Sequence, residues 1–251
     1  WGGRNFQFKN EAQKTWLERC VAKGYTVPDW PKPYGGAGMS PAEAKIWREE
    51  CARIGARPPL SSFGIWMLGP ALLKFGTEEQ KVHYLNQIAR GEIRWCQGYS
   101  EPGSGSDLVS LQTFGEDKGD HWVVNGQKIW TSGAHYSDYG ILLTRTDPTV
   151  PKHKGLTMFF LDMKSPGVEV RPIKQANGMQ EFNEVYFTDV VIPDSQRLGT
   201  VGDGWNVSLT TLMNERMSIG ARQSTGKTGS APSSSSCGAS AASRSSARAP
   251  S

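Results

Sequence analysis

Tyr99-Ser100-Glu101-Pro102-Gly103-Ser104-Gly105-Ser106-Asp107 is the most informative stretch of the chain, because a strand end here runs into a loop of small residues. A loop of this kind presents several backbone amides and hydroxyls, and it is suited to holding an anionic or heteroaromatic ligand. An ordinary polar turn has a similar composition, so the neighbouring sequence must decide between the two interpretations.

Strand signals follow this loop. The series Trp122-Val123-Val124, Asn125-Gly126, Lys128-Ile129-Trp130 predicts a β-hairpin, because Asn-Gly favours the type I′ turn that matches the twist of paired strands. Further strands are expected at residues 139–146, 156–161, 168–170 and 184–187, which are separated by Pro, Gly and Asp. Residues 93–200 are therefore expected to form a β domain.

Helix signals precede the loop. Ser40-Pro41 followed by Glu43 combines an N-cap, a proline suited to the first helical turn and a capping box. Trp47, Cys51 and Ile54 then recur on one helical face, and Gly55 ends the pattern.

Two more helical segments complete this part. Thr77 with Gln80 forms a second capping box, opening a helix whose Leu85, Ile88 and Ala89 are expected to face a core. Residues 65–75 are almost wholly apolar and are expected to form a buried helix, which is too short to span a membrane. Residues 1–92 are therefore expected to be all α-helical.

The chain changes character after the β domain. Residues 204–221 have a helical pattern in Trp205, Leu209, Leu212, Met213 and Met217. Residues 222–251 contain no large apolar side chain and consist mostly of Ser, Ala, Gly and Arg, so we expect a disordered low-complexity tail. The abrupt change predicts a different reading frame or an artificial end, and the start at Trp1 predicts an incomplete N-terminus.

The net charge of +4 does not indicate nucleic-acid binding. Arg222, Lys227, Arg244 and Arg248 lie in a tail without acidic residues, and they account for the whole excess of 28 basic over 24 acidic side chains. The rest of the chain is neutral and has no overall bias toward phosphate backbones.

No run has the ~18 apolar residues of a membrane helix, and no signal peptide is evident. We expect neither a nucleic acid nor a membrane as a partner.

The remaining chemical signals are weak. The four cysteines and four histidines are scattered without metal-ligand spacing, which predicts reduced thiols, a cytoplasmic location and no metal site. His135 follows Trp130 closely and is a candidate for shaping a site there. Residues 221–228 match a permissive phosphate-loop pattern, but they follow a helix where a true phosphate loop follows a buried strand.

The motifs taken together resemble the acyl-CoA dehydrogenase family. Residues 101–107 match its flavin signature Glu-Pro-Gly-x-Gly-Ser-Asp, and Lys128-Ile129-Trp130-Thr131-Ser132 is similar to its later Lys-x-Trp-Ile-Thr segment. Trp30-Pro31, residues 76–81, residues 184–193 and Asn214-Glu215-Arg216 also resemble family segments, in collinear order across residues 11–221.

This resemblance implies an α+β fold in three parts: an N-terminal α-helical domain (1–92), a middle β-barrel or sandwich that binds flavin and acyl-CoA (93–200), and a C-terminal helical bundle. Only the first helix of that bundle (201–221) is present before the tail (222–251). The missing helices complete the pocket in family members. A chain shortened in this way is expected to be weakly stable, to retain FAD poorly and to expose the apolar stripe of its last helix.

The resemblance also implies site residues. Gln97, Tyr99, Ser100, Gly105, Ser106, Trp130, Thr131 and Ser132 are implied to bind FAD. Ser106 and Arg216 are implied to contact the acyl-CoA substrate. Ser132 stands where the family usually has threonine and keeps the hydroxyl, whereas a tryptophan such as Trp130 is otherwise an ordinary core residue.

Glu215 is the candidate catalytic base. The family removes a proton α to the thioester carbonyl while hydride leaves the β carbon for flavin N5, and the proton needs a base. Most members carry that carboxylate beyond the end of this sequence, but the isovaleryl and long-chain subgroups place it on an earlier helix before an arginine, as in Glu215-Arg216. A glutamate on a helix surface is the alternative, and the sequence leaves both open.

The implied activity is α,β-dehydrogenation of an acyl-CoA thioester, with electrons passed to an electron-transfer flavoprotein and a homo- or hetero-oligomeric full-length enzyme. An acyl-CoA oxidase or flavin monooxygenase on the same scaffold, or an inactive truncated fragment, is the alternative. The acyl chain stays open, although Trp66, Met67 and Leu68 are candidates for the pocket wall.

Overall fold

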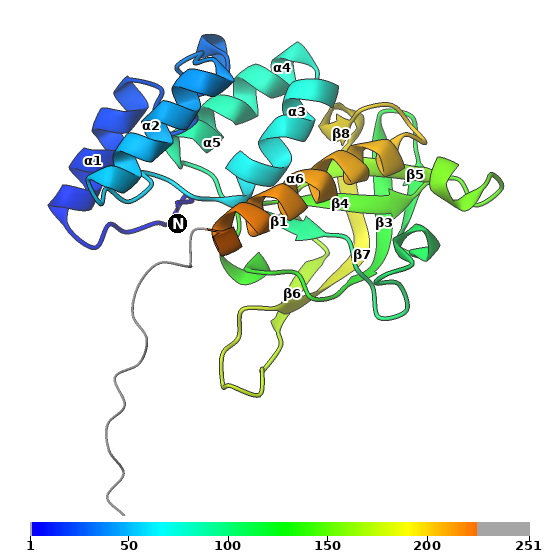
Figure 1. Cartoon of the computed structure of the whole chain (residues 1–251). Coiled ribbons are helices and arrows are strands. Elements are labelled where there is room, and N and C mark those ends of the chain that lie inside the picture. The colour runs from blue at the N-terminus through cyan, green and yellow to red at the C-terminus, as the bar shows by residue number, and fades with distance from the viewer. Residues whose placement is uncertain (1, 225–251) are drawn as a thin grey trace, which may run out of the picture.

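The computed structural model describes the backbone of residues 2–224 and the side chains of residues 2–215. Its α-helices are α1 (Glu11–Ala22), α2 (Pro41–Arg53), α3 (Gly69–Phe75), α4 (Glu78–Gln80), α5 (Asn86–Arg90) and α6 (Gly204–Ser224). Its strands are β1 (Trp95–Gly98), β2 (Phe114–Asp117), β3 (His121–Lys128), β4 (Tyr139–Arg145), β5 (Leu156–Asp162), β6 (Val168–Pro172), β7 (Asn183–Pro193) and β8 (Arg197–Leu198). Helices α1–α5 gather on one side of the molecule and the strands on the other, while α6 lies against α3 and β5 (Figure 1). The α+β class expected from the sequence is confirmed.

The helical part begins its helices where the capping patterns predicted. Ser40 accepts a hydrogen bond from the Glu43 amide, and the Glu43 carboxylate accepts one from the Ser40 amide, which is a complete capping box. Thr77 and Gln80 form the second capping box. The face predicted for α2 is partly wrong, because the helix ends at Arg53 and Ile54, its C-cap, is 65% exposed.

The apolar run at residues 65–75 is helical, as predicted, and it contains a π-helical turn, η2 (Gly64–Leu68), before α3. A second π-helical turn, η3 (Lys81–Leu85), lies between α4 and α5. Leu85, Ile88 and Ala89 are buried in the core, as predicted. Single π turns within helices occur frequently at functional sites, and η2 contributes to the cleft described below.

The strands form one eight-stranded sheet in the order β6-β7-β3-β2-β4-β5-β8, with β1 added in parallel to β4. Strand β4 is buried on both faces: Ile141 and Leu143 join the core under the helices, and Leu142 joins a second core. That second core also contains Trp122 of β3 and Phe159 of β5, whose ring centroids are 5.2 Å apart. The β3/β7 and β4/β5 parts of the sheet therefore enclose an interior, as in the barrel-like or sandwich-like domain expected.

The hairpin predicted at Asn125-Gly126 is wrong. Strand β3 continues through both residues, and its register against β7 shifts between Val124 and Gly126. Asn125 exchanges hydrogen bonds of 2.9 and 3.0 Å with Asp189, and Gly126 has φ of 145° at a point where a Cβ would lie 2.7 Å from the Thr113 Cα. The pair therefore forms a β-bulge within a strand.

The apolar stripe of α6 is divided between core and solvent, and part of it is exposed, as expected from the sequence. Val207, Ser208 and Thr211 are fully buried, whereas Leu209 and Met213 are 40% and 59% exposed. Gly204 fixes which face of α6 packs against the sheet, because it approaches β5 so closely that a Cβ there would lie 2.8 Å from backbone atoms of that strand. Ser208 and Thr211 donate hydrogen bonds to helix carbonyls, so both fit the buried face. The side chain of Met217, the phosphate-loop pattern and the predicted disordered tail lie outside the described residues, apart from the backbone of residues 221–224.

Candidate active site

Strand β1 places its side chains at a cleft of about 370 Å³ between the η2 turn, the sheet and α6. Six of the residues predicted from the sequence line this cleft together: Gln97, Trp130, Ser132 and Glu215 from the motifs, and Trp66 and Met67 from the expected pocket wall. Leu68, the third residue expected in that wall, is fully buried and does not line the cleft. The other lining residues are Ser61, Ser62, Phe63, Arg94, Trp95 and Tyr136. The cleft therefore combines aromatic surfaces with hydroxyl, amide, carboxylate and guanidinium groups, the mixture typical of a binding site for an organic cofactor or substrate.

The loop after β1 is fixed by a buried ion pair. Lys128 is fully buried, and its Nζ donates to Glu101 Oε1 at 2.8 Å and to the Tyr99 carbonyl at 3.0 Å. The Glu101 carboxylate also accepts hydrogen bonds from the Gln112 and Thr113 amides at 2.6 and 2.8 Å. The start of the loop is thereby attached to strand β3 and to the segment that leads into β2.

The pKa values of this pair show the opposing effects of burial and charge. Burial lowers the pKa of Lys128 from 10.5 to about 8, against the effect of the Glu101 carboxylate, which raises it. Burial alone raises the pKa of Glu101, but Lys128 and the donors of Thr113 and Gln112 outweigh this effect and bring it below its ordinary 4.5. Near neutral pH both groups are charged, and the ion pair holds the loop in one conformation.

The segment after Lys128 presents Trp130 to the cleft. Trp130 has φ of 60°, a left-handed conformation that is costly for a bulky residue, and its side chain is 57% exposed. Backbone bonds hold it in place: the Thr131 amide donates to the Asn183 carbonyl at 3.0 Å, and the Gly133 amide donates to the Glu181 carbonyl at 2.8 Å. Strained residues with imposed conformations cluster at functional sites.

Asn183 is the centre of this attachment and was not singled out from the sequence. It is fully buried, and its Nδ2 donates to the Thr131 carbonyl at 2.8 Å. Its Oδ1 lies 3.0 Å from Nδ1 of His135, the residue singled out beside Trp130 in the sequence. An asparagine that begins a strand gives no sequence signal of this role, since its partners are about 50 residues earlier in the chain.

Glu215 enters the cleft from α6. It is half-buried, and burial raises the pKa of its carboxyl above the ordinary 4.5. A carboxylate in such surroundings is a stronger base than one in water, which is the property needed to abstract a proton. The side chain of Arg216, implied to contact substrate, lies outside the described residues.

The fit to a flavin can be judged from unpartnered polar atoms. Gln97 Nε2 is buried and has no hydrogen-bond partner in the described part of the chain. Buried polar atoms are normally paired, so this donor indicates a ligand with a complementary group. Thr131 Oγ1 also has no partner there, but Thr131 lines a separate cavity of about 10 Å³ inside the sheet and not this cleft. Together with the exposed face of Trp130 and the Ser132 hydroxyl, the Gln97 donor fits a heteroaromatic ring with hydrogen-bonding edges.

The other predicted residues lie outside the cleft lining. Tyr99 is buried, and its hydroxyl forms a 2.7 Å hydrogen bond with the Thr211 hydroxyl of α6. Ser100 accepts a hydrogen bond from the Ile129 amide through its carbonyl. Gly105 and Ser106 are exposed in the loop and do not line the cleft. Arg94 and Trp95, by contrast, line the cleft and were missed, because neither belongs to a motif.

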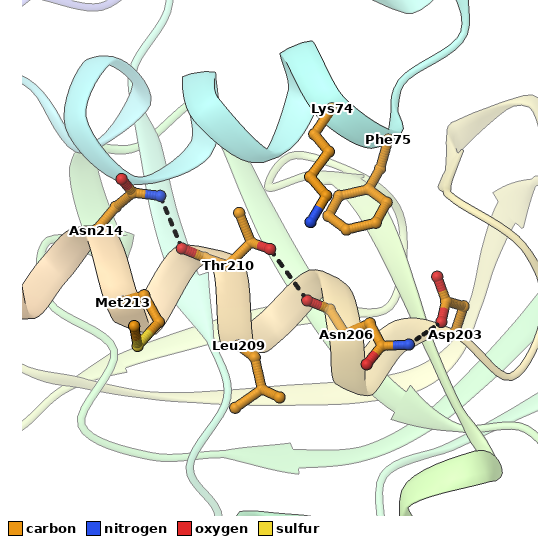
Figure 2. Close-up of a pocket in the computed structure, with 8 residues that line it drawn as sticks. All are labelled: Lys74, Phe75, Asp203, Asn206, Leu209, Thr210, Met213 and Asn214. Carbon is orange, nitrogen blue, oxygen red and sulfur yellow. Dashed lines mark hydrogen bonds between the residues drawn. The ribbon is translucent and has the colours of Figure 1, made fainter.

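A second cleft, of about 490 Å³, lies between α3 and α6 and contains none of the predicted site residues. Figure 2 shows Lys74 and Phe75 of α3 facing the turn and helix that carry Asp203, Asn206, Leu209, Thr210, Met213 and Asn214. The dashed contacts are internal to this turn and α6, where Asn214 donates to the Thr210 carbonyl and Thr210 to the Asn206 carbonyl. The Asn and Thr side chains of this cleft are thus already paired, and none of its residues has a buried polar atom without a partner, unlike the first cleft.

Two features of the described residues limit the kinds of site present. Within residues 2–224, no helix has the length and apolarity to cross a membrane. No group of three or more His, Cys, Asp or Glu side chains in that part of the chain is arranged to hold a metal ion.

Comparisons with known proteins agree with this geometry. Residues 4–92 match the family model "Acyl-CoA dehydrogenase, N-terminal domain", and residues 96–190 match "Acyl-CoA dehydrogenase, middle domain". Acyl-CoA dehydrogenase IpdE1 of Mycobacterium tuberculosis is 44% identical over 206 residues, which are 82% of this chain and 54% of that protein.

Solved structures give the same picture. The Tcur3481-Tcur3483 steroid ACAD superposes with a TM-score of 0.71 at 38% identity, covering 84% of this chain and 54% of that one. The ChsE4-ChsE5 complex from Mycobacterium tuberculosis superposes with a TM-score of 0.67 at 35% identity, covering 82% and 52%. The chain therefore spans about half the length of the curated relatives it matches.

Proposed function

The chain belongs to the acyl-CoA dehydrogenase family, and from this premise we propose that its cleft carries out α,β-dehydrogenation of an acyl-CoA thioester with FAD. The observation that carries the proposal is the shared cleft: the half-buried Glu215 carboxylate lines the same space as Gln97, Trp130 and Ser132. A base and flavin-binding groups in one cavity are what the reaction needs.

The chain's own residues have distinct roles in this proposal. Glu215 accepts the proton from the carbon α to the thioester, and its raised pKa increases its basicity for that step. Trp130 would pack against the flavin, while Gln97 and Ser132 would bond its polar edge. FAD, when bound, accepts the hydride from the β carbon. The Lys128–Glu101 pair and Asn183 hold the two flavin-facing segments in position.

The electron acceptor and the assembly belong to the whole protein. We propose an electron-transfer flavoprotein as acceptor, because this is the acceptor implied by the dehydrogenase family. A hetero-oligomeric assembly is supported by the ChsE4-ChsE5 complex among the similar structures. An oxidase on the same scaffold is distinguished by rapid reoxidation of reduced flavin by oxygen without that acceptor.

The test is the visible absorption of the purified chain after incubation with FAD and desalting. Acyl-CoA thioesters of increasing length, and an alicyclic one in view of the similar steroid ACAD, are then added anaerobically. Bleaching of the flavin bands by one of them supports the proposal. In Glu215→Gln the flavin bands are expected to be as strong as in the wild-type chain and the bleaching to be lost. Bleaching that persists unchanged in Glu215→Gln excludes Glu215 as the base, and failure of the chain to retain FAD excludes flavin chemistry by this chain on its own.

A further inference from the structure

One wall of the active-site cleft is rich in hydrogen-bond donors. Arg94 and Trp95, which precede Gln97 at the start of β1, both line it. The Trp95 side chain is buried, and its indole Nε1 has no hydrogen-bond partner in the described part of the chain. An indole N–H can only donate, and a buried donor without an acceptor is rare in folded proteins.

Arg94 adds a cation to this wall. Its guanidinium carbon lies 4.1 Å from the centroid of the Tyr136 ring, so the planar face is covered by an aromatic side chain. Stacking covers the face of the guanidinium but leaves its N–H groups, which lie in its plane, free to donate. Two of these N–H groups can bind one carboxylate as a bidentate pair. No carboxylate among residues 2–215 forms an ion pair with Arg94.

The position of Arg94 is fixed by its backbone. Its amide donates to Asp138 Oδ2 at 2.8 Å, and its carbonyl accepts hydrogen bonds from the Asp138 and Tyr139 amides at 2.8 and 3.0 Å. The Asp138 carboxylate is thus occupied by backbone donors and by Arg4. The strand start is therefore held on both sides while the guanidinium remains available to a ligand.

The cleft contains few hydrogen-bond acceptors for these donors. Glu215 is the one acidic side chain among the described residues that line it, and the proposed reaction uses that carboxylate at the thioester end of the substrate. Phe63, Trp66 and Met67 form an apolar wall from residues at and within η2. A plain alkyl chain would satisfy this apolar wall and leave the guanidinium and the indole N–H without acceptors.

We propose that Arg94 and Trp95 select acyl-CoA thioesters whose acyl group carries a carboxylate remote from the thioester, with the Arg94 fork and the Trp95 N–H as its donors. This inference rests on the proposed function, because it places the acyl group in the same cleft. A site built to bond a polar substrate group discriminates strongly against an analogue that lacks the group.

The experiment is calorimetric binding to the whole chain in the presence of excess FAD. Two matched pairs of thioesters are used, hexanoyl-CoA with adipyl-CoA and octanoyl-CoA with suberyl-CoA, which differ only by a terminal methyl or carboxylate. The wild-type chain is expected to bind the dicarboxylic member of at least one pair about tenfold more tightly or better. Arg94→Met is expected to abolish the preference, and Trp95→Phe, which keeps an aromatic ring, to reduce it several-fold.

Controls separate this inference from the function on which it rests. Arg90→Met removes an equal charge from an arginine outside the cleft that pairs with Glu92, and it is expected to leave the preference unchanged. Arg94→Lys keeps the positive charge but loses the paired N–H donors of the guanidinium, and it is expected to retain only part of the preference. This variant also serves as a control if Arg94→Met does not fold. Tight binding of the alkyl thioesters without preference overturns the inference alone. Failure of all four thioesters to bind overturns the proposed function as well.

Discussion

Glu215 is a single residue whose protonation links stability to the chemistry proposed for the cleft. Burial raises the pKa of its carboxyl above 4.5 in the folded chain. Between 4.5 and that raised value the folded state therefore binds more protons than the unfolded state, and this group makes the folded chain less stable as pH rises through the window. The burial that makes the carboxylate more basic therefore also lowers the stability of the folded chain at neutral pH.

We expect Glu215→Gln to be more stable than the wild-type chain at pH 7.5, while the difference diminishes near pH 4. Thermal unfolding at the two pH values measures this, with Glu184→Gln, whose carboxylate is on strand β7 and bonds the Tyr186 hydroxyl, as the matched control. An effect of Glu215→Gln that is equal at both pH values would show that burial of the charge is not its cause.

The buried pair of Lys128 and Glu101 gives a second prediction at this scale. Removing one partner leaves an uncompensated buried charge, which typically costs about 3–5 kcal/mol. We expect Glu101→Gln and Lys128→Met each to lower the free energy of unfolding strongly, and the double variant to lose much less than the two losses added together. Urea unfolding of the four proteins gives the coupling energy. Additive losses would contradict the close pairing.

The same pair has a pH signature. Because burial lowers the pKa of Lys128 from 10.5 to about 8, the folded state binds fewer protons than the unfolded state between these values. This group therefore makes the free energy of unfolding rise with pH in that window, and the Lys128→Met variant is expected to lack this slope.

Among the elements, strand β3 shows how tertiary contacts override a local preference. Asn125-Gly126 favours a two-residue turn in isolation, but the side chain of Asn125 is bonded to Asp189 on β7, and Gly126 packs on Thr113. The partners lie 64 residues later and 13 residues earlier in the chain, so a local pattern does not contain them.

Gly126→Ala is the test of this bulge. A Cβ at this position meets the Thr113 backbone at 2.7 Å in a backbone conformation with φ of 145°, so we expect a loss of unfolding free energy on the order of 1–3 kcal/mol. Gly119→Ala, in the β2–β3 turn, also has a positive φ but has no atom within 4 Å of the added Cβ, and it is expected to cost less. Denaturant unfolding of both variants compares them, and equal losses would show that only φ matters.

The sequence predicts those elements best whose signals are local. The capping boxes at Ser40 and Thr77 and the buried run after Gly64 are local, and each is found where predicted. The rotation of α6 is not local, because the close approach of Gly204 to β5 turns Ser208 and Thr211 inward and leaves Leu209 outside.

The candidate site divides in the same way. The motifs predicted Gln97, Trp130, Ser132 and Glu215, and the fold brings these four to one cleft. Arg94, Trp95 and Asn183 gain their positions only from pairing with distant segments. Which donors remain without a partner is likewise a property of the folded chain, and a motif does not record it.

At the scale of the whole molecule, α6 presents an apolar surface to solvent. Leu209 and Met213 are one helical turn apart, and both are exposed beside the cleft of Figure 2. Contiguous exposed apolar side chains favour association. We expect the chain to self-associate with increasing concentration, and Leu209→Ser combined with Met213→Ser to reduce this in sedimentation velocity. Ile46→Ser, at an equally exposed position on α2, is the control and is expected to have no effect.

The core beneath the helices has a consequence for how the molecule melts. Tyr84 of η3 contacts Trp95 of β1, Tyr139 of β4 and Phe160 of β5, with ring centroids 5.0–5.6 Å apart. Leu72 and Ile88 from the helices belong to the same buried cluster as Ile141 and Met158 from the sheet. Separating helices from sheet would hydrate this shared interior, so neither part retains a native state without the other. We expect differential scanning calorimetry to record one cooperative transition, with equal calorimetric and van't Hoff enthalpies. This single transition is expected even though the sequence divides clearly into a helical part and a β part.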